Sequence, residues 1–126
     1  MFLTERIISA AMKVHNTLGP GFLEKVYENA LLIELRSMGL FVEQQKSIPV
    51  FYEGQNVGDY FSDIIVEKKI LVELKAVSGL SDSHGAVCLN YLRCAELPVC
   101  LLLNFGTPRL QIKRLVSSFY DPSNPL

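Results

Sequence analysis

The sequence has few cysteines, no excess of charge of either sign and no long hydrophobic run. Its three cysteines, Cys88, Cys94 and Cys100, are too few and too odd in number for a disulfide framework, and their spacing predicts no structural zinc site. Free thiols and a cytoplasmic location are therefore expected. Twelve basic residues nearly balance thirteen acidic ones, so the composition predicts no general attraction to nucleic acid or to an anionic membrane, and a nucleic-acid partner would need a local basic groove.

Membrane segments, repeats and low-complexity tracts are also missing. No stretch approaches the roughly 18 consecutive apolar residues of a membrane span. Glu5 and Arg6 interrupt the apolar start before it could form a signal peptide. With 126 residues, of which 49% are hydrophobic and 20% charged, the chain predicts a single domain over residues 1–120 and a mobile tail at 121–126.

The spacing of apolar residues predicts two helices and then mainly strands. Gly19-Pro20-Gly21 ends the first helix, because proline lacks a backbone donor and glycine tolerates positive φ. Pro49 suits an edge strand, and VCLLLN, apolar on both faces, predicts a central strand. The order ααβββαββ predicts an α/β fold with a mixed sheet between helices. The expected elements are helices 4–18 (with Thr4 as N-cap) and 22–38, strands 42–52, 59–67 and 70–77, a helix 84–96, and strands 99–104 and 110–116.

Asp63 and the Glu73-Leu74-Lys75 segment carry the clearest candidate chemistry. Glu73 and Lys75 share one face of an otherwise apolar strand, where two charges need water, a metal or each other. Two carboxylates offer the hard oxygen ligands that Mg²⁺ or Mn²⁺ prefers, and a lysine can orient an attacking water. The alternative that these residues leave open is a Glu73–Lys75 pair on a solvated strand face.

The parity of the predicted hairpin decides whether Asp63 and Glu73 can share a metal. Directly opposed residues of an antiparallel pair point to the same side. Opposition of Asp63 and Glu73 requires the three-residue tip Glu67-Lys68-Lys69, whereas a two-residue Lys68-Lys69 turn would place Asp63 opposite Leu74. Because this tip has neither the glycine nor the asparagine that two-residue turns favour, we expect a tip of odd length, or a bulge that restores the parity.

A further acidic residue lies in the segment GFLEKVY, which places Glu24 and Tyr27 one helical turn apart. Glu24 either faces the metal as another carboxylate or stabilises the positive end of its helix. Similarly, His84 either helps to bind a phosphate or caps the helix that follows.

GFLEKVY fits the GxxExxY signature of a family of small bacterial and archaeal proteins. ILVELKAVSGL, residues 84–92 and LLLNFG followed by IKRLV are similar to the same family, so the resemblance covers residues 7–116. The family is grouped with the PD-(D/E)XK nuclease superfamily, which implies a restriction-endonuclease-like fold. The resemblance also implies Asp63, Glu73 and Lys75 as the nuclease core, Glu24 as an added acidic residue, and the Leu74 carbonyl as a further metal ligand.

Two positions depart from the pattern of that family. Its members usually carry glutamine four residues before a tyrosine in the helix after the ExK strand, and here Tyr91 is present but Val87 replaces the glutamine. Many members have arginine where this chain has Phe61. Both changes lower the phosphate affinity expected of the site and leave the metal ligands in place.

The sequence therefore predicts a Mg²⁺- or Mn²⁺-dependent nuclease that hydrolyses phosphodiester bonds of DNA or RNA, with Tyr27, His84 and Tyr91 as candidate substrate contacts. The alternative is a weak or inactive nuclease-fold module that acts through protein contacts or oligomerisation. Val87, Phe61 and the near-zero net charge favour the alternative, whereas the intact acidic residues and lysine favour the enzyme. The partners implied are nucleic acid and a second copy of the chain, and no membrane.

Overall fold

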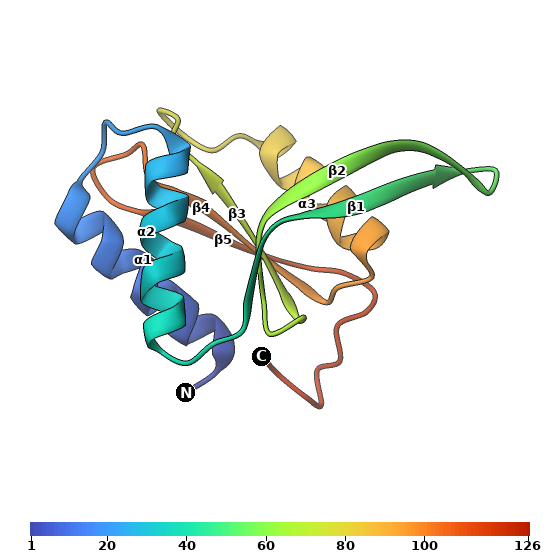
Figure 1. Ribbon diagram of the computed structural model, residues 1–126, viewed down its shortest axis with the longest axis horizontal. Helices are drawn as coiled ribbons and strands as arrows, with labels where there is room; N and C mark the ends of the chain where they lie inside the picture. Colours follow the sequence, from blue (N-terminus) through green and yellow to red (C-terminus); the bar gives the residue numbers. More distant parts are fainter.

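The computed structural model describes all 126 residues and shows a five-stranded mixed sheet with helices on both faces (Figure 1). The strands lie in the order β1-β2-β3-β4-β5, and only β3 and β4 are parallel. The predicted order ααβββαββ and the mixed α/β architecture are confirmed. The elements are α1 (Leu3–Leu18), α2 (Glu24–Ser37), β1 (Val42–Tyr52), β2 (Gln55–Val66), β3 (Ile70–Lys75), α3 (Asp82–Ala95), β4 (Val99–Asn104) and β5 (Gln111–Val116).

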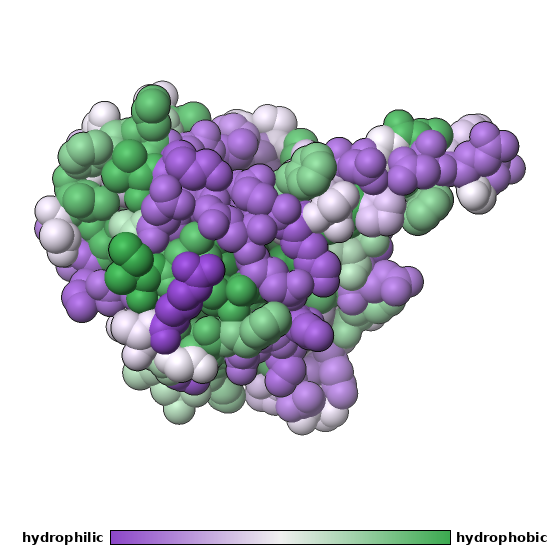
Figure 2. Space-filling model, in the orientation of Figure 1, coloured by the Kyte–Doolittle hydropathy of each residue, from purple (hydrophilic) through white to green (hydrophobic).

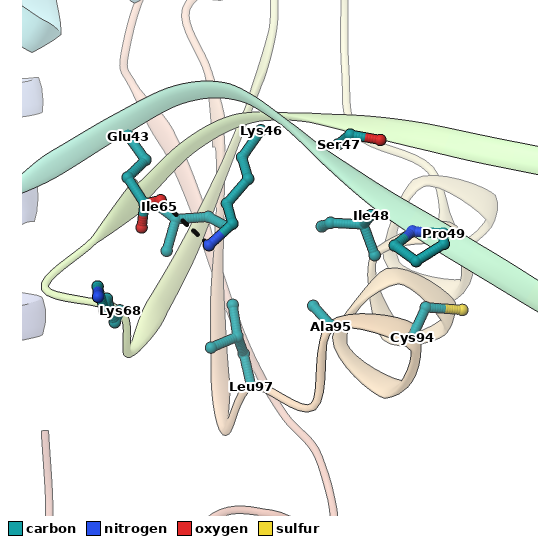
Figure 3. A pocket seen from close by; sticks show the side chains of 10 residues that line it. All are labelled: Glu43, Lys46, Ser47, Ile48, Pro49, Ile65, Lys68, Cys94, Ala95 and Leu97. Carbon is teal, nitrogen blue, oxygen red and sulfur yellow. Dashed lines mark ion pairs between the residues drawn. The ribbon is translucent and has the colours of Figure 1, made fainter.

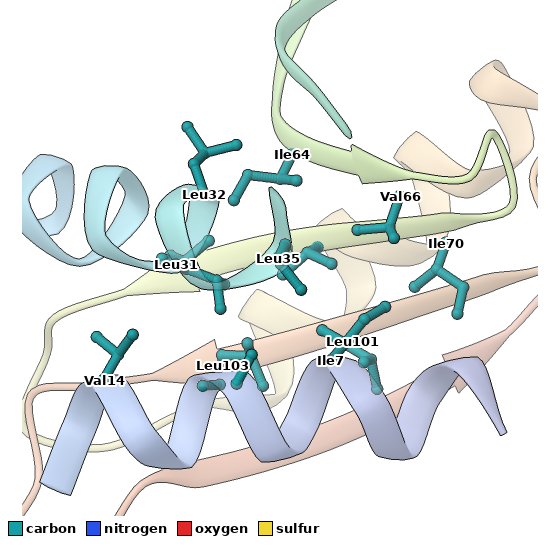
Figure 4. Packing of buried hydrophobic residues seen from close by; sticks show 14 of the residues in the cluster. Ile7, Val14, Leu31, Leu32, Leu35, Ile64, Val66, Ile70, Leu101 and Leu103 are labelled. Carbon is teal, nitrogen blue, oxygen red and sulfur yellow. The ribbon is translucent and has the colours of Figure 1, made fainter. Parts of the chain in front are cut away.

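Two hydrophobic cores lie on opposite faces of the sheet. In the larger core, Ile7 and Val14 of α1 and Leu35 of α2 pack against strand residues (Figure 4). In the smaller core, α3 covers the other face and contributes the buried hydrophobic residues Cys88 and Leu92. Every residue of β4 is buried because its side chains alternate between the two cores, which confirms the central strand predicted from VCLLLN.

The start of α1 and the end of the chain lie together. Thr4 is not an N-cap, because its Oγ1 donates a hydrogen bond to the Leu126 carbonyl at 2.8 Å and Phe2 occupies the cap position. The Leu126 carbonyl also accepts the backbone N–H of Thr4 at 3.1 Å. The side chain of Leu126 packs against the larger core. The last residue, Leu126, therefore lies against the start of α1.

β1 and β2 form a long hairpin that extends from the body of the molecule (Figure 1). Its turn is Glu53-Gly54, with φ of 50° and 73°, and Tyr52 pairs with Gln55. These positive φ values are those of a primed two-residue turn. β2 therefore begins at Gln55 and not at residue 59, and β1 is an edge strand, as Pro49 predicts.

Asn104 ends β3 at Lys75, two residues earlier than expected. Its completely buried side chain accepts the backbone N–H groups of Val77 at 3.0 Å and Gly106 at 3.1 Å, and it donates to the Val77 carbonyl at 3.1 Å. The segment after Lys75 is thus bound to a side chain of β4 and no longer to a strand ladder. This network holds the end of the candidate catalytic strand in place.

Gly106 is predicted to tolerate no side chain. A Cβ atom there would lie 2.7 Å from the carbonyl carbon of Ala76, which is backbone that cannot swing aside. We expect Gly106→Ala to lower the free energy of unfolding by about 1–3 kcal/mol in chemical denaturation, as overpacking does. Gly58→Ala is the control, because nothing lies within 4 Å of its added Cβ. Equal stabilities of the two variants would contradict this packing.

Candidate functional site

The β2–β3 hairpin brings Asp63 and Glu73 to the same face of the sheet. Its register pairs Ile64 with Val72 and Val66 with Ile70, which leaves the three-residue tip predicted from parity. The same register places Asp63 opposite Glu73, on the side of α3. Two tip residues, Glu67 and Lys68, adopt positive φ of 54° and 55° to close this turn without glycine.

The two carboxylates bind backbone groups where β2 and β3 part. The last regular pair of the ladder is Ile64 with Val72. Beyond it, the Asp63 N–H donates to Glu73 Oε1 at 3.3 Å, and the Leu74 N–H donates to Asp63 Oδ2 at 2.8 Å. Each carboxylate therefore accepts a backbone N–H of the opposite strand, and this exchange holds the two carboxylates beside one another.

Burial makes the paired negative charges unfavourable. Glu73 is only 7% exposed, and its burial together with the charge of Asp63 raises the pKa of Glu73 to about 9. Burial also raises the pKa of Asp63, against the opposing effect of the hydrogen bond from Leu74. A bound divalent cation would favour the ionised form of both groups. The donor set thus fits a metal ion that prefers oxygen ligands.

Two tyrosines form an aromatic wall beside the carboxylates. Tyr60 of β2 and Tyr91 of α3 stack with their rings nearly parallel, at an interplanar angle of 10°. Burial raises the pKa of Tyr60, and the charges of Glu73 and Asp63 raise it further. Burial and the charge of Glu73 likewise raise the pKa of Tyr91. Both phenols therefore remain protonated beside the acidic pair.

Lys75 lies on the face of β3 that carries Glu73, two residues further along the strand. It is half-buried, and it forms no ion pair with Glu73 or with any other acidic residue. The surface ion pair that the sequence left open is therefore not formed. The Lys75 ammonium group remains free to meet a ligand at this end of the strand.

The acidic residue that α2 contributes near the site is Glu28, which sequence reasoning missed. Glu24, expected to face the metal, is exposed at the first position of α2. Glu28 is 3% exposed and accepts hydrogen bonds from Lys25 at 2.9 Å and from Gln45 at 3.1 Å. Gln45 also donates to Asp63 at 3.4 Å, and the charge of Glu28 contributes to the raised pKa of Asp63.

Tyr27 and His84, expected near a substrate, are engaged by the fold. Tyr27 is completely buried, and its hydroxyl donates to the Gly19 carbonyl at 2.6 Å and accepts the Phe22 N–H at 3.1 Å. It therefore fixes the loop before α2 and offers no surface to a ligand. His84 Nδ1 accepts the N–H of Ser81 at 3.0 Å in a capping box, which also explains why α3 begins two residues before the expected start.

A separate pocket of about 300 Å³ opens between the root of the β1–β2 hairpin and the end of α3 (Figure 3). Ile48, Ile65 and Leu97 line it, and Glu43 forms an ion pair with Lys46 at 3.1 Å along one wall. Neither Asp63 nor Glu73 lines this pocket. The carboxylate pair is therefore a site of its own, and the pocket does not define it.

The donor set is small. No three His, Cys, Asp or Glu side chains converge on one metal position. Mg²⁺ is commonly held by one or two carboxylates and completes its shell with water and substrate phosphates. The arrangement of Asp63 and Glu73 is compatible with that mode of binding.

The family model of the PD-(D/E)XK nuclease superfamily matches residues 2–115, so the chain belongs to that superfamily. The match includes every strand and helix except the last residue of β5. No curated protein and no solved structure matches the chain. None of its helices combines the length and the apolar character that crossing a membrane requires.

The raised pKa of Glu73 predicts a pH-dependent stability of the metal-free protein. The native state binds a proton at Glu73 up to about pH 9, whereas the unfolded state releases it near the ordinary value of 4.5. Stability is therefore lost as the pH rises through this interval. We expect Glu73→Gln to raise the melting temperature in EDTA at pH 8 and to have little effect at pH 4.

The exposed Glu53 at the hairpin tip provides the control, as Glu53→Gln. Its melting curves should follow those of the wild type at both pH values. A Glu73→Gln variant whose melting temperature differs from the wild type by the same amount at pH 4 and pH 8 would show that Glu73 titrates normally.

Proposed function

We propose that the chain is a divalent-metal-dependent nuclease that hydrolyses phosphodiester bonds of DNA or RNA. The observation that carries the proposal is the pair of the half-buried Asp63 and the buried Glu73, opposed across the strands in a chain of the PD-(D/E)XK nuclease superfamily. Two adjacent carboxylates, one buried and one half-buried, without a cationic partner are unfavourable for folding, so a binding role is the better explanation for them. The GxxExxY signature at Gly21, Glu24 and Tyr27 supports the same reading.

Each residue has a proposed role. Asp63, Glu73 and the Leu74 carbonyl would hold Mg²⁺ or Mn²⁺, and the bound ion would supply Lewis-acid stabilisation of charge on the scissile phosphate. Lys75 orients the attacking water from the same strand face. Tyr91 of the aromatic wall contacts the substrate beside the metal.

On α2 we propose Glu28 in place of Glu24 as the acidic residue that influences the site. Its carboxylate reaches Asp63 through the side chain of Gln45. Such a contact orients a metal ligand without binding the metal itself. Glu24 then retains the favourable position of an acidic residue at a helix N-terminus.

Metal binding tests the ligand assignment. Because a ligand that binds only the native state stabilises it, Mn²⁺ at about 100 times its Kd should add about 2.7 kcal/mol and raise the melting temperature by several degrees. Asp63→Asn combined with Glu73→Gln should abolish this shift, while Glu53→Gln should retain it. An unchanged shift in the double variant would exclude these ligands.

Cleavage tests the activity itself. We expect hydrolysis of at least one of single-stranded DNA, duplex DNA, single-stranded RNA and duplex RNA with Mg²⁺ or Mn²⁺, followed on gels. Glu73→Ala should abolish it, and Lys75→Ala should lower the rate at least about 100-fold while Mn²⁺ binding persists, since general acid–base groups contribute about 10²–10⁴-fold. Activity that survives Glu73→Ala would place the reaction elsewhere.

The second candidate function is a nuclease-fold module that acts through protein contacts. Exposed apolar side chains favour it: Phe22, Leu23 and Val26 at the start of α2 are 47%, 81% and 39% exposed. Figure 2 shows hydrophobic residues gathered over the part of the molecule formed by α1 and α2. Mn²⁺ binding without cleavage of any of the four substrates, together with self-association in sedimentation experiments, would favour this function.

Val87 offers a further test of the two candidates. It lies exposed on α3, one turn before Tyr91, where the resembling family usually has glutamine. If the missing amide limits phosphate binding, Val87→Gln should increase cleavage several-fold at a fixed metal concentration and lower KM more than it changes kcat. Leu89→Gln on the exposed face of α3 is the matched control. Equal rates for both variants and the wild type would show that position 87 is not limiting.

A further inference from the structure

Tyr60 is a half-buried residue with a buried hydroxyl for which the fold provides no hydrogen-bond partner. Its ring stacks on Tyr91 and packs against the core beneath α3. The hydroxyl oxygen is buried and has no hydrogen-bond partner. Buried hydroxyl groups in folded proteins nearly always have a partner, and an orphaned one needs an explanation. Because a phenylalanine would keep the ring stack, packing alone does not account for the tyrosine.

A kink in the hairpin aims this hydroxyl at the carboxylates. Tyr60 and Asp63 are three residues apart, so a regular strand would place them on opposite faces. The alternation is interrupted between Tyr60, which packs in the core beneath α3, and Ile64, which packs in the core beneath α1 and α2. Gln45 is the residue of β1 opposite Asp63, and its φ of 52° marks the kink.

No strong hydrogen-bond donor holds the Glu73 carboxylate, and the Tyr60 hydroxyl could act as one. The Asp63 N–H donates to the carboxylate at 3.3 Å, which is long for a hydrogen bond between an N–H and an oxygen. Whereas burial raises the pKa of Glu73, the nearby Tyr60 hydroxyl lowers it as a hydrogen-bond donor does. A carboxylate that binds a metal through one oxygen is usually held by a hydrogen bond at the other. A protonated phenol close to this carboxylate can act only as a donor toward it.

We propose that Tyr60 is a positioning residue, whose hydroxyl donates a hydrogen bond to the Glu73 carboxylate and holds it in the orientation that binds a divalent cation. This inference rests on the proposed function, because it assigns Glu73 to the metal. The stack on Tyr91 fixes the phenol ring, so the orientation of Glu73 depends on the contact between β2 and α3. Tyr60 itself touches neither the metal nor the substrate.

The test is the affinity for Mn²⁺, measured from the free-ion signal in electron paramagnetic resonance titrations. Tyr60→Phe removes only the hydroxyl and should raise the Kd about tenfold or more, as the loss of a hydrogen bond to a metal ligand does. Tyr52→Phe removes an exposed hydroxyl at the end of β1, away from the carboxylates, so its Kd should stay within about twofold of the wild-type value. Melting curves in EDTA confirm that both variants are folded.

A double-mutant cycle separates positioning from a general effect on the fold. In a Glu73→Ala background, Tyr60→Phe should not weaken the remaining Mn²⁺ binding further, because the group that it positions is gone. A folded Tyr60→Phe variant with the wild-type Kd, or an equal loss in the Glu73→Ala background, would overturn the role of Tyr60 and leave the proposed function intact. A wild-type chain that binds no Mn²⁺ would overturn both.

Discussion

The exchange of hydrogen bonds between Asp63 and Glu73 is the interaction on which the site depends. At the point where β2 and β3 part, each of the two carboxylates accepts a backbone N–H of the opposite strand. This satisfies the backbone and at the same time confines two negative charges to a largely buried position. Burial raises the pKa of both groups, so a cation at this position would relieve a penalty that the apolar surroundings impose.

Structural features at both ends of β3 keep Asp63 and Glu73 in the positions that this exchange of hydrogen bonds requires. The three-residue tip sets the parity of the hairpin, because a tip shorter by one residue would turn Asp63 to the side of Leu74. At the other end of β3, the side chain of Asn104 binds the backbone of Val77 and holds the segment after Lys75. Both devices act on the backbone, so the site is positioned by turn geometry and buried hydrogen bonds and does not rely on ion pairs.

Strand parity, the central β4 strand and the element order could be predicted because each follows from the pattern of residues within one element or one hairpin. The surroundings of the carboxylates could not. Strict alternation along β2 would place Tyr60 on the face of the sheet opposite to Asp63. The kink that brings both to one face depends on the positive φ of Gln45, a conformation that glutamine rarely adopts. Glu28 did carry a signal, because it lies in helical register with the buried Leu31 and Leu35, but its role depends on the long-range contact with Gln45.

The same limit applies to the motif residues of α2. Glu24 and Tyr27 lie one turn apart, which is compatible with a shared site. However, the Tyr27 hydroxyl forms hydrogen bonds with the backbone of the loop before α2, and Glu24 is exposed to solvent. Around the carboxylates, the exposed Phe61 and Val87 stand where the resembling family usually has polar groups. Substrate binding at the proposed site would therefore depend mainly on the metal ion, Lys75 and Tyr91.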